Sequence, residues 1–366
     1  MNDLRLVHCS IRDLEAPSEK CSEMQRTLAT KLDMTNETWL AVEGTELALD
    51  SFVRKSSIAW FALPLAVWAG VSVSRRGNAE GNDLKEVNER CAIRLSAALL
   101  GHGTTAEFAA NPNPQLYVDT VLNDARFIDR FARFLNASFN RVPGASSQED
   151  AAYHLGKYVL EHNEPYKSLF VGPFNVDADD KGNVAVTDNP EGLGYFRSLP
   201  WMYRYAGNEG SGLKLVTAYR IFNNTVGLEL VATTADPNAD VSVTTRDTNP
   251  TCRGCHFEGW SALDLAARVL TRKKVVDGKV QFIPPDSGPQ LVADRTVSND
   301  KELVTALVES ENFRFNACRL AFKFLYGRTE NACESNVFDA CVDAFTATGK
   351  IQSAIASIAK DPSFCQ

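Results

Sequence analysis

Several features that mark other protein classes are missing from this sequence. It has no apolar run of about 20 residues, the length that usually spans a membrane. Its net charge is −8, and its lysines and arginines do not cluster, whereas nucleic-acid and anionic-membrane surfaces need clustered basic side chains. It also lacks a Ser-His-Asp order, a phosphate-binding glycine loop and an HExxH zinc motif. We therefore expect no nucleic-acid partner and none of the enzyme classes that these motifs mark.

One shorter apolar stretch is present, at 58–73 (IAWFALPLAVWAGVSV), after Arg54 and Lys55. A basic start, a short apolar segment and small residues at the far end are typical of a signal peptide. We interpret 53–79 as a signal peptide or signal anchor, and 1–52 as a doubtful N-terminal extension. With either interpretation, we expect the remaining chain to be exported to the periplasm or cell surface, with no membrane contact beyond an N-terminal anchor.

The pattern of apolar residues predicts a mainly α protein. Apolar residues recur at helical spacing over 83–165 and again over 273–366, which predicts two helical domains. The segment between them, 166–272, is richer in glycine, asparagine and proline, so we expect a mixed, loop-rich middle domain there. Its part at 213–230 fits a helix or a pair of strands, and 275–283 predicts a small hairpin.

The sharpest motif is Cys252-Arg-Gly-Cys255-His256. Covalent attachment of haem c needs two thiols on successive helical turns, which add to the two vinyl groups, and a histidine that reaches the iron. With nine cysteines and five histidines in the chain, chance would produce this pattern about 0.003 times. We expect one covalent haem c on Cys252 and Cys255, with His256 as an axial iron ligand.

Two other interpretations of the motif remain open. A thioredoxin-like redox pair should follow a strand, whereas residues 247–251 (DTNPT) predict a loop before Cys252. A zinc site would need further ligands at regular spacing, and the next cysteine is Cys318.

The far side of the iron is less defined by the sequence. The chain has four methionines, and none follows His256, so a distal ligand must come from upstream or be absent. Met202 is the methionine candidate, and His102, His154 and His162 are the histidine candidates. A methionine would raise the reduction potential, a histidine would lower it, and an open position would permit ligand binding.

Several blocks of the sequence, beyond the motif, resemble a known group. This resemblance covers most of 83–366 and is to the multi-domain cytochrome c-like proteins of the planctomycete and myxobacterial type. The matching blocks are 94–101 (RLSAALLG), 117–127 (YVDTVLNDARF), 129–134 (DRFARF), 193–230, 312–328 (NFRFNACRLAFKFLYGR) and 358–364 (IAKDPSF). The resemblance implies haem binding and electron transfer. The group usually has a Met-Asp-Pro-like stretch after the haem histidine, whereas this chain has 257–261 (FEGWS), so no ligand is inferred from there.

Cysteines also gather near the C-terminus. Cys318, Cys333, Cys341 and Cys365 fall in predicted helices, and export favours disulfides among them. Their three pairings cannot be ranked from sequence. We interpret Cys91 as the odd thiol, buried in a helix.

Together these features predict an exported, single-haem c-type cytochrome that transfers one electron at a time to a redox partner that the sequence does not identify. The alternative is a haem enzyme of the peroxidase or oxygenase type with an open distal iron site. A third hypothesis is a binding or structural protein in which the haem is incidental. Whether the chain is an enzyme stays open on the sequence alone.

Overall fold

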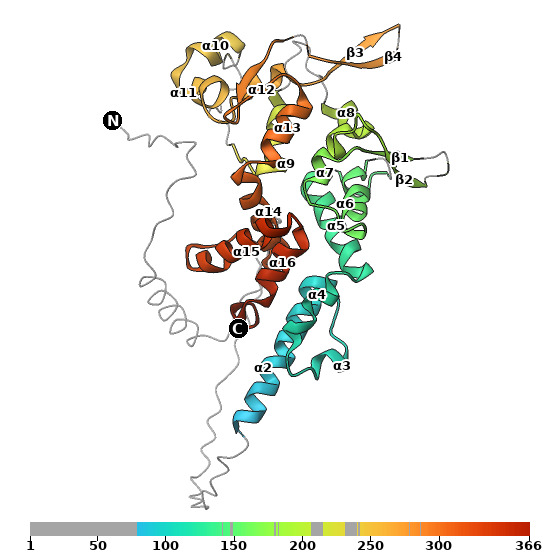
Figure 1. Ribbon diagram of the computed structural model, residues 1–366, viewed down its shortest axis with the longest axis vertical. Helices are drawn as coiled ribbons and strands as arrows, with labels where there is room; N and C mark the ends of the chain where they lie inside the picture. Colours follow the sequence, from blue (N-terminus) through green and yellow to red (C-terminus); the bar gives the residue numbers. More distant parts are fainter. Residues whose placement is uncertain are drawn as a thin grey trace, which may run out of the picture. The chain divides into compact units, whose positions relative to one another are not determined.

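The computed structural model describes residues 79–140, 142–146, 149–178, 181, 183–205, 215–230, 240, 242–277, 279–285 and 287–366. The predicted N-terminal extension, and the signal segment up to residue 78, lie outside these ranges. The described residues from Leu84 to Gln366 belong to one compact unit, and most of them are helical (Figure 1). The prediction of a mainly α protein is confirmed, while the division into domains at 165 and 272 stays a prediction.

The described residues from 79 to 171 are mainly helical, as the apolar spacing over 83–165 predicts. The first helix continues into a wider π turn and ends at Gly101, whose φ of 74° needs a residue without a β-carbon. The elements are α2 (Ala79–Leu95), η1 (Ser96–Leu100), α3 (Ala106–Ala109), η2 (Pro114–Tyr117), α4 (Val118–Val121), α5 (Ala125–Phe139), α6 (Ala151–Glu161) and α7 (Ser168–Val171).

Helices α5 and α6 pack side by side (Figure 1). The apolar stripe of α5 includes Phe127, Phe131 and Leu135, which are all buried. Gly156 of α6 faces this stripe, and a β-carbon there would lie 3.0 Å from the Leu135 side chain. The glycine therefore lets the two helices approach closely.

The middle segment combines a hairpin with short helices. Strands β1 (Phe174–Ala178) and β2 (Val184–Asp188) are antiparallel, with Val176 opposite Val186. They are followed by η3 (Gly194–Arg197), α8 (Leu199–Tyr205) and α9 (Leu215–Val226). The ambiguous segment at 213–230 thus contains a helix, and α9 buries Ile221 and Phe222.

After α9 come α10 (Val243–Thr248), α11 (Pro250–Arg253), η4 (Gly254–Glu258) and α12 (Leu263–Arg268). The predicted hairpin is present as β3 (Arg272–Val276) and β4 (Lys279–Ile283). A further hairpin, β5 (Gln290–Val292) with β6 (Arg295–Val297), was not predicted. Its turn places Ala293 and Asp294 at φ 53° and 59°. Aspartate adopts this left-handed conformation more often than most residues do, but alanine rarely does, so the turn was not evident from the sequence.

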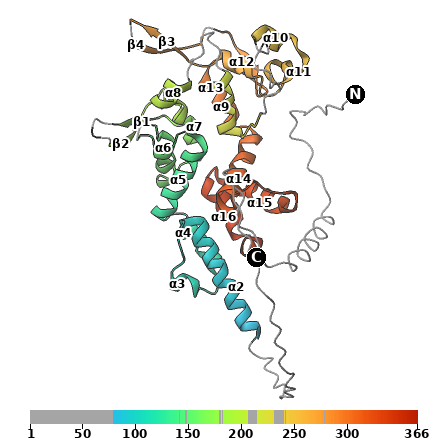
Figure 2. The ribbon, with the colours of Figure 1, turned by 180° about the vertical axis from the view of Figure 1, so that it is seen from behind.

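The C-terminal helices are α13 (Asp300–Val308), α14 (Glu311–Tyr326), α15 (Ser335–Thr348) and α16 (Ile351–Lys360), with η5 (Ala332–Glu334) and η6 (Pro362–Cys365) beside them. Helices α14, α15 and α16 pack together (Figure 2), and a disulfide joins Cys318 of α14 to Cys341 of α15. Phe324 of α14 also meets Phe131 of α5 edge to face, with ring centroids 5.0 Å apart. The core is therefore shared between the N-terminal and C-terminal helices.

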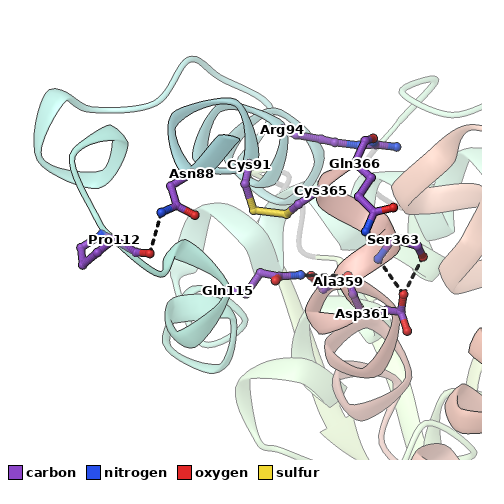
Figure 3. Close-up of a disulfide and its surroundings, with 10 residues drawn as sticks. All are labelled: Asn88, Cys91, Arg94, Pro112, Gln115, Ala359, Asp361, Ser363, Cys365 and Gln366. Atoms are coloured by element: carbon purple, nitrogen blue, oxygen red, sulfur yellow. Dashed lines mark hydrogen bonds between the residues drawn. A yellow bond between two sulfur atoms is a disulfide. The ribbon is translucent and has the colours of Figure 1, made fainter. Parts of the chain in front are cut away.

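A second disulfide, Cys91–Cys365, joins α2 to the C-terminal end of the chain (Figure 3). Beside it, the Arg94 guanidinium donates to the Gln366 carbonyl at 3.1 Å, and the Gln115 amide donates to the Asp361 carbonyl at 2.9 Å. The interpretation of Cys91 as an odd thiol is therefore wrong, because the fold brings the two ends of the described chain together. Among the described residues, no helix is both long and apolar enough to cross a membrane.

Candidate haem site

Two short helices lead into the cysteine motif. The Ser242 hydroxyl accepts a hydrogen bond from the Thr245 amide at 3.3 Å and caps α10. Asn249 ends α10, and its side chain accepts from the Thr251 amide at 2.9 Å to cap α11, where Pro250 takes the first helical position. Cys252 lies in α11, so a capped helical turn presents the first thiol.

A π turn, η4, carries the second half of the motif and places Cys255 and His256 directly after α11. The turn closes tightly on itself, because a β-carbon at Gly259 would lie 2.2 Å from the Gly254 carbonyl oxygen. A β-carbon at Gly254, by contrast, would meet nothing within 4 Å. The motif thus has one face open to space, and glycine is required only at its far end.

His256 is held by a buried carboxylate. Its Nδ1 lies 2.7 Å from Oδ2 of Asp264 on α12. The Arg246 guanidinium on α10 grips the same carboxylate with two hydrogen bonds, from Nε to Oδ2 at 2.8 Å and from the terminal nitrogen to Oδ1 at 2.7 Å. Asp264 and Arg246 are each 4% exposed, while the His256 side chain is 23% exposed. The imidazole is therefore fixed from the inside and accessible from the outside.

The ionisation of Asp264 follows from its partners. Burial is the largest influence and by itself would raise the pKa of this carboxyl, but the hydrogen bonds from Arg246 and His256 outweigh it and lower the pKa below its usual value. An ionised carboxylate only accepts hydrogen bonds, so Nδ1 of His256 carries the proton that it donates. In the neutral ring, Nε2 then keeps its lone pair, which is the state that a metal-binding imidazole needs.

The two motif thiols are distinguished from the other cysteines. Cys252 and Cys255 are half-buried and form no disulfide, whereas the other five cysteines of the described residues are all disulfide-bonded. Arg253, between the thiols, pairs with Asp247 at 2.7 Å and with Glu258 at 2.5 Å. These ion pairs hold the exposed side of the motif.

The residues present fit a covalently attached haem in three respects. Two thiols lie about one helical turn apart, the following histidine has a fixed tautomer, and the surface at Gly254 is open. A carboxylate is also one of the groups that usually accept the second N–H of a metal-bound imidazole.

The sequence candidates for a distal ligand are spread over other elements. Met202 is 3% exposed on α8, and its amide donates to the Ser198 carbonyl at 3.0 Å. The two exposed histidines have local partners: Nδ1 of His102 lies 2.6 Å from the Gly103 carbonyl oxygen, and His162 stacks on Tyr158. His154 contacts the neighbouring Tyr153 ring. These partners of the four residues all lie outside the motif.

A hollow in the described part of the chain also lies away from the motif. It is an open hollow of about 820 Å³ between η1, α5 and α14, and Leu100, Arg130 and Phe324 are among its lining residues. None of the three motif residues lines it.

The surroundings bear on the two competing interpretations of the cysteine pair. Helices precede Cys252, because residues 247–248 belong to α10 and residues 250–251 to α11. The expectation of a loop over 247–251 is therefore wrong at every residue except Asn249. A thioredoxin-like cysteine pair should follow a strand, whereas helices α10 and α11 lead into Cys252. Among the described residues, no group of three or more histidine, cysteine or acidic side chains is placed to hold a metal ion.

Sequence reasoning missed Arg246 and Asp264. Their spacing from His256, ten residues before and eight after, follows no known motif. One signal was available: Asp264 interrupts the apolar run Leu263 to Ala266, and an acid in a buried helical stripe needs a partner.

We compared the chain with known proteins. No protein-family model, no curated protein and no solved structure matches it.

Proposed function

We propose that this chain carries one haem c, bound covalently through Cys252 and Cys255, with His256 as an axial iron ligand, and that it transfers single electrons. The bound haem would supply an iron that alternates between its ferrous and ferric states. The chain would supply the attachment, the orientation of the ligand and the surroundings that set the potential.

The observation that carries this proposal is the hydrogen bond from Nδ1 of His256 to the Asp264 carboxylate. A hydrogen bond to a buried carboxylate holds the ring of His256 in place. A ligating histidine gains a fixed ring plane and a fixed tautomer, which leaves Nε2 available to the iron. The geometry therefore suits metal ligation by His256.

The disulfides support export, which the proposal requires. Cys91–Cys365 and Cys318–Cys341 are typical of a chain that matures in an oxidising compartment. We therefore place the mature protein in the periplasm or at the cell surface. Its resemblance to the planctomycete and myxobacterial type of cytochrome c-like protein, seen in the sequence blocks, agrees with this assignment.

The proposal is tested by producing the full chain in a host that attaches c-type haem and staining a denaturing gel for haem. The wild-type chain should keep its haem through denaturation, and C252A/C255A should lose it. Gly254→Ala is the matched control within the motif, because its new methyl group meets nothing within 4 Å; it should keep the stain. A wild-type chain without covalent haem would end the proposal.

A second candidate function is a haem enzyme of the peroxidase or oxygenase type. The ionised Asp264 favours it, since a carboxylate partner makes the ligating imidazole more basic and pushes electron density towards the iron. Ready binding of carbon monoxide to the reduced holoprotein would support an open distal site and this second function. A spectrum that carbon monoxide leaves unchanged would support a six-coordinate electron carrier.

A further inference from the structure

The Arg246–Asp264 ion pair, rather than the exposed motif itself, is the feature of this site that sequence patterns do not explain. We propose that Asp264 is a positioning residue that holds the haem of this protein at a low reduction potential, and that Arg246 moderates its effect. The inference rests on the proposed haem attachment and concerns how the chain tunes it.

The Asp264 carboxylate changes the electron density on His256, the proposed iron ligand. A carboxylate that accepts the Nδ1 proton draws that proton towards itself and leaves more electron density on Nε2. The bond is short, 2.7 Å, and the carboxylate is 4% exposed, so water screens its charge little. Electron density on the ligand and negative charge nearby both favour ferric over ferrous iron.

The Arg246 guanidinium supplies a positive charge that opposes this effect. Arg246 holds both oxygens of Asp264 in a bidentate grip, which withdraws part of the carboxylate charge from His256. The arginine is also 4% exposed, so its charge acts at the same depth. The two side chains should therefore shift the potential in opposite directions.

The same fold contains a matched control in another buried pair. Arg197 of η3 binds Asp300 of α13 with two hydrogen bonds, at 2.7 and 3.0 Å, and Thr271 joins them. Asp300 is 7% exposed, close to Asp264 in burial, and these two partners of its carboxylate lie outside the motif. Replacing Asp300 removes a buried negative charge that Arg197 and Thr271 bind. The variant therefore measures how much the loss of such a charge shifts the reduction potential.

The experiment is a spectroelectrochemical titration of the holoprotein at about pH 8, well above the titration of carboxyl groups. Asp264→Asn keeps the shape and an acceptor for Nδ1 but removes the charge, so a role in holding the ring alone would leave the potential unchanged. We expect this variant to favour ferrous iron at least tenfold more than the wild type does, a rise of about 59 mV for one electron. Arg246→Gln should move the potential the other way, and Asp300→Asn should leave it near the wild-type value.

The outcomes separate this inference from the proposed function. Covalent haem in Asp264→Asn at the wild-type potential would overturn the inference and leave the proposed function standing. A higher potential in Arg246→Gln than in the wild type would also overturn the inference, which keeps the test decisive should Asp264→Asn fail to fold. A wild-type chain that takes up no haem would overturn both.

Discussion

We expect the Cys91–Cys365 disulfide to contribute more to the free energy of unfolding than the Cys318–Cys341 disulfide does. Its stabilisation arises mainly from restricting the unfolded chain, and the restriction grows with the length of the closed loop. The cysteines lie 274 residues apart, against 23 for Cys318–Cys341. The chain-entropy relation gives about 5.6 kcal/mol for the long loop and about 3.4 kcal/mol for the short one. The variant C91A/C365A should therefore lose about 2.2 kcal/mol more stability than C318A/C341A.

Equilibrium urea unfolding of the oxidised protein, followed by circular dichroism, measures both losses. The comparison is conservative, because Cys318 and Cys341 are fully buried and their replacement also removes packing, whereas Cys365 is partly exposed. In reducing buffer the wild type should be less stable than either oxidised variant. A larger loss for C318A/C341A than for C91A/C365A would refute the reasoning from loop length.

Two further predictions concern the site. The pKa of Asp264 is lower in the folded chain, so its ion pair stabilises the fold fully above the unfolded carboxyl pKa of about 3.9, and this contribution is lost as the pH falls through the folded value. The difference in unfolding free energy between wild type and Asp264→Asn, measured in urea from neutral pH downwards, should then shrink in acid; a constant difference would contradict it. Gly259→Ala should cost about 1–3 kcal/mol because its β-carbon would meet the Gly254 carbonyl oxygen at 2.2 Å, whereas Gly254→Ala should stay within about 0.5 kcal/mol of the wild type. Equal unfolding midpoints for the two alanine variants would argue against the tight turn.

Local signals predicted much of the fold. The apolar stripe of α5 and the β3–β4 hairpin appear where the spacing of apolar residues and the Asp277-Gly278 turn signal place them. Their structure depends on residues that are neighbours in the chain, so the pattern carries the information. The segment around α9 stayed ambiguous because a short apolar run suits either a helix or strands, and burial against α12 and α14 decides it.

Features that depend on distant residues were not predictable in the same way. Nothing near Cys91 points to Cys365, and their pairing follows only from how α2 meets the end of the chain. The same holds within the site. Cys252, Cys255 and His256 are recognisable because the haem c motif has a fixed spacing. Asp264 bonds His256, and Arg246 bonds Asp264, from two separate helices at no fixed spacing.

Stability alone does not account for the Arg246–Asp264 pair. Burying two opposite charges costs desolvation of both, and apolar side chains of similar volume often stabilise a fold as well or better. The Arg197–Asp300 pair has a structural role, since it joins η3 and Thr271 to the start of α13, and Arg197 keeps a quarter of its side chain in water. The Arg246–Asp264 pair is more deeply buried, and its carboxylate also bonds the one histidine that follows the two thiols. The carboxylate at this position therefore serves His256 as well as Arg246, and an oriented imidazole is what the proposed ligand to a redox-active metal would require.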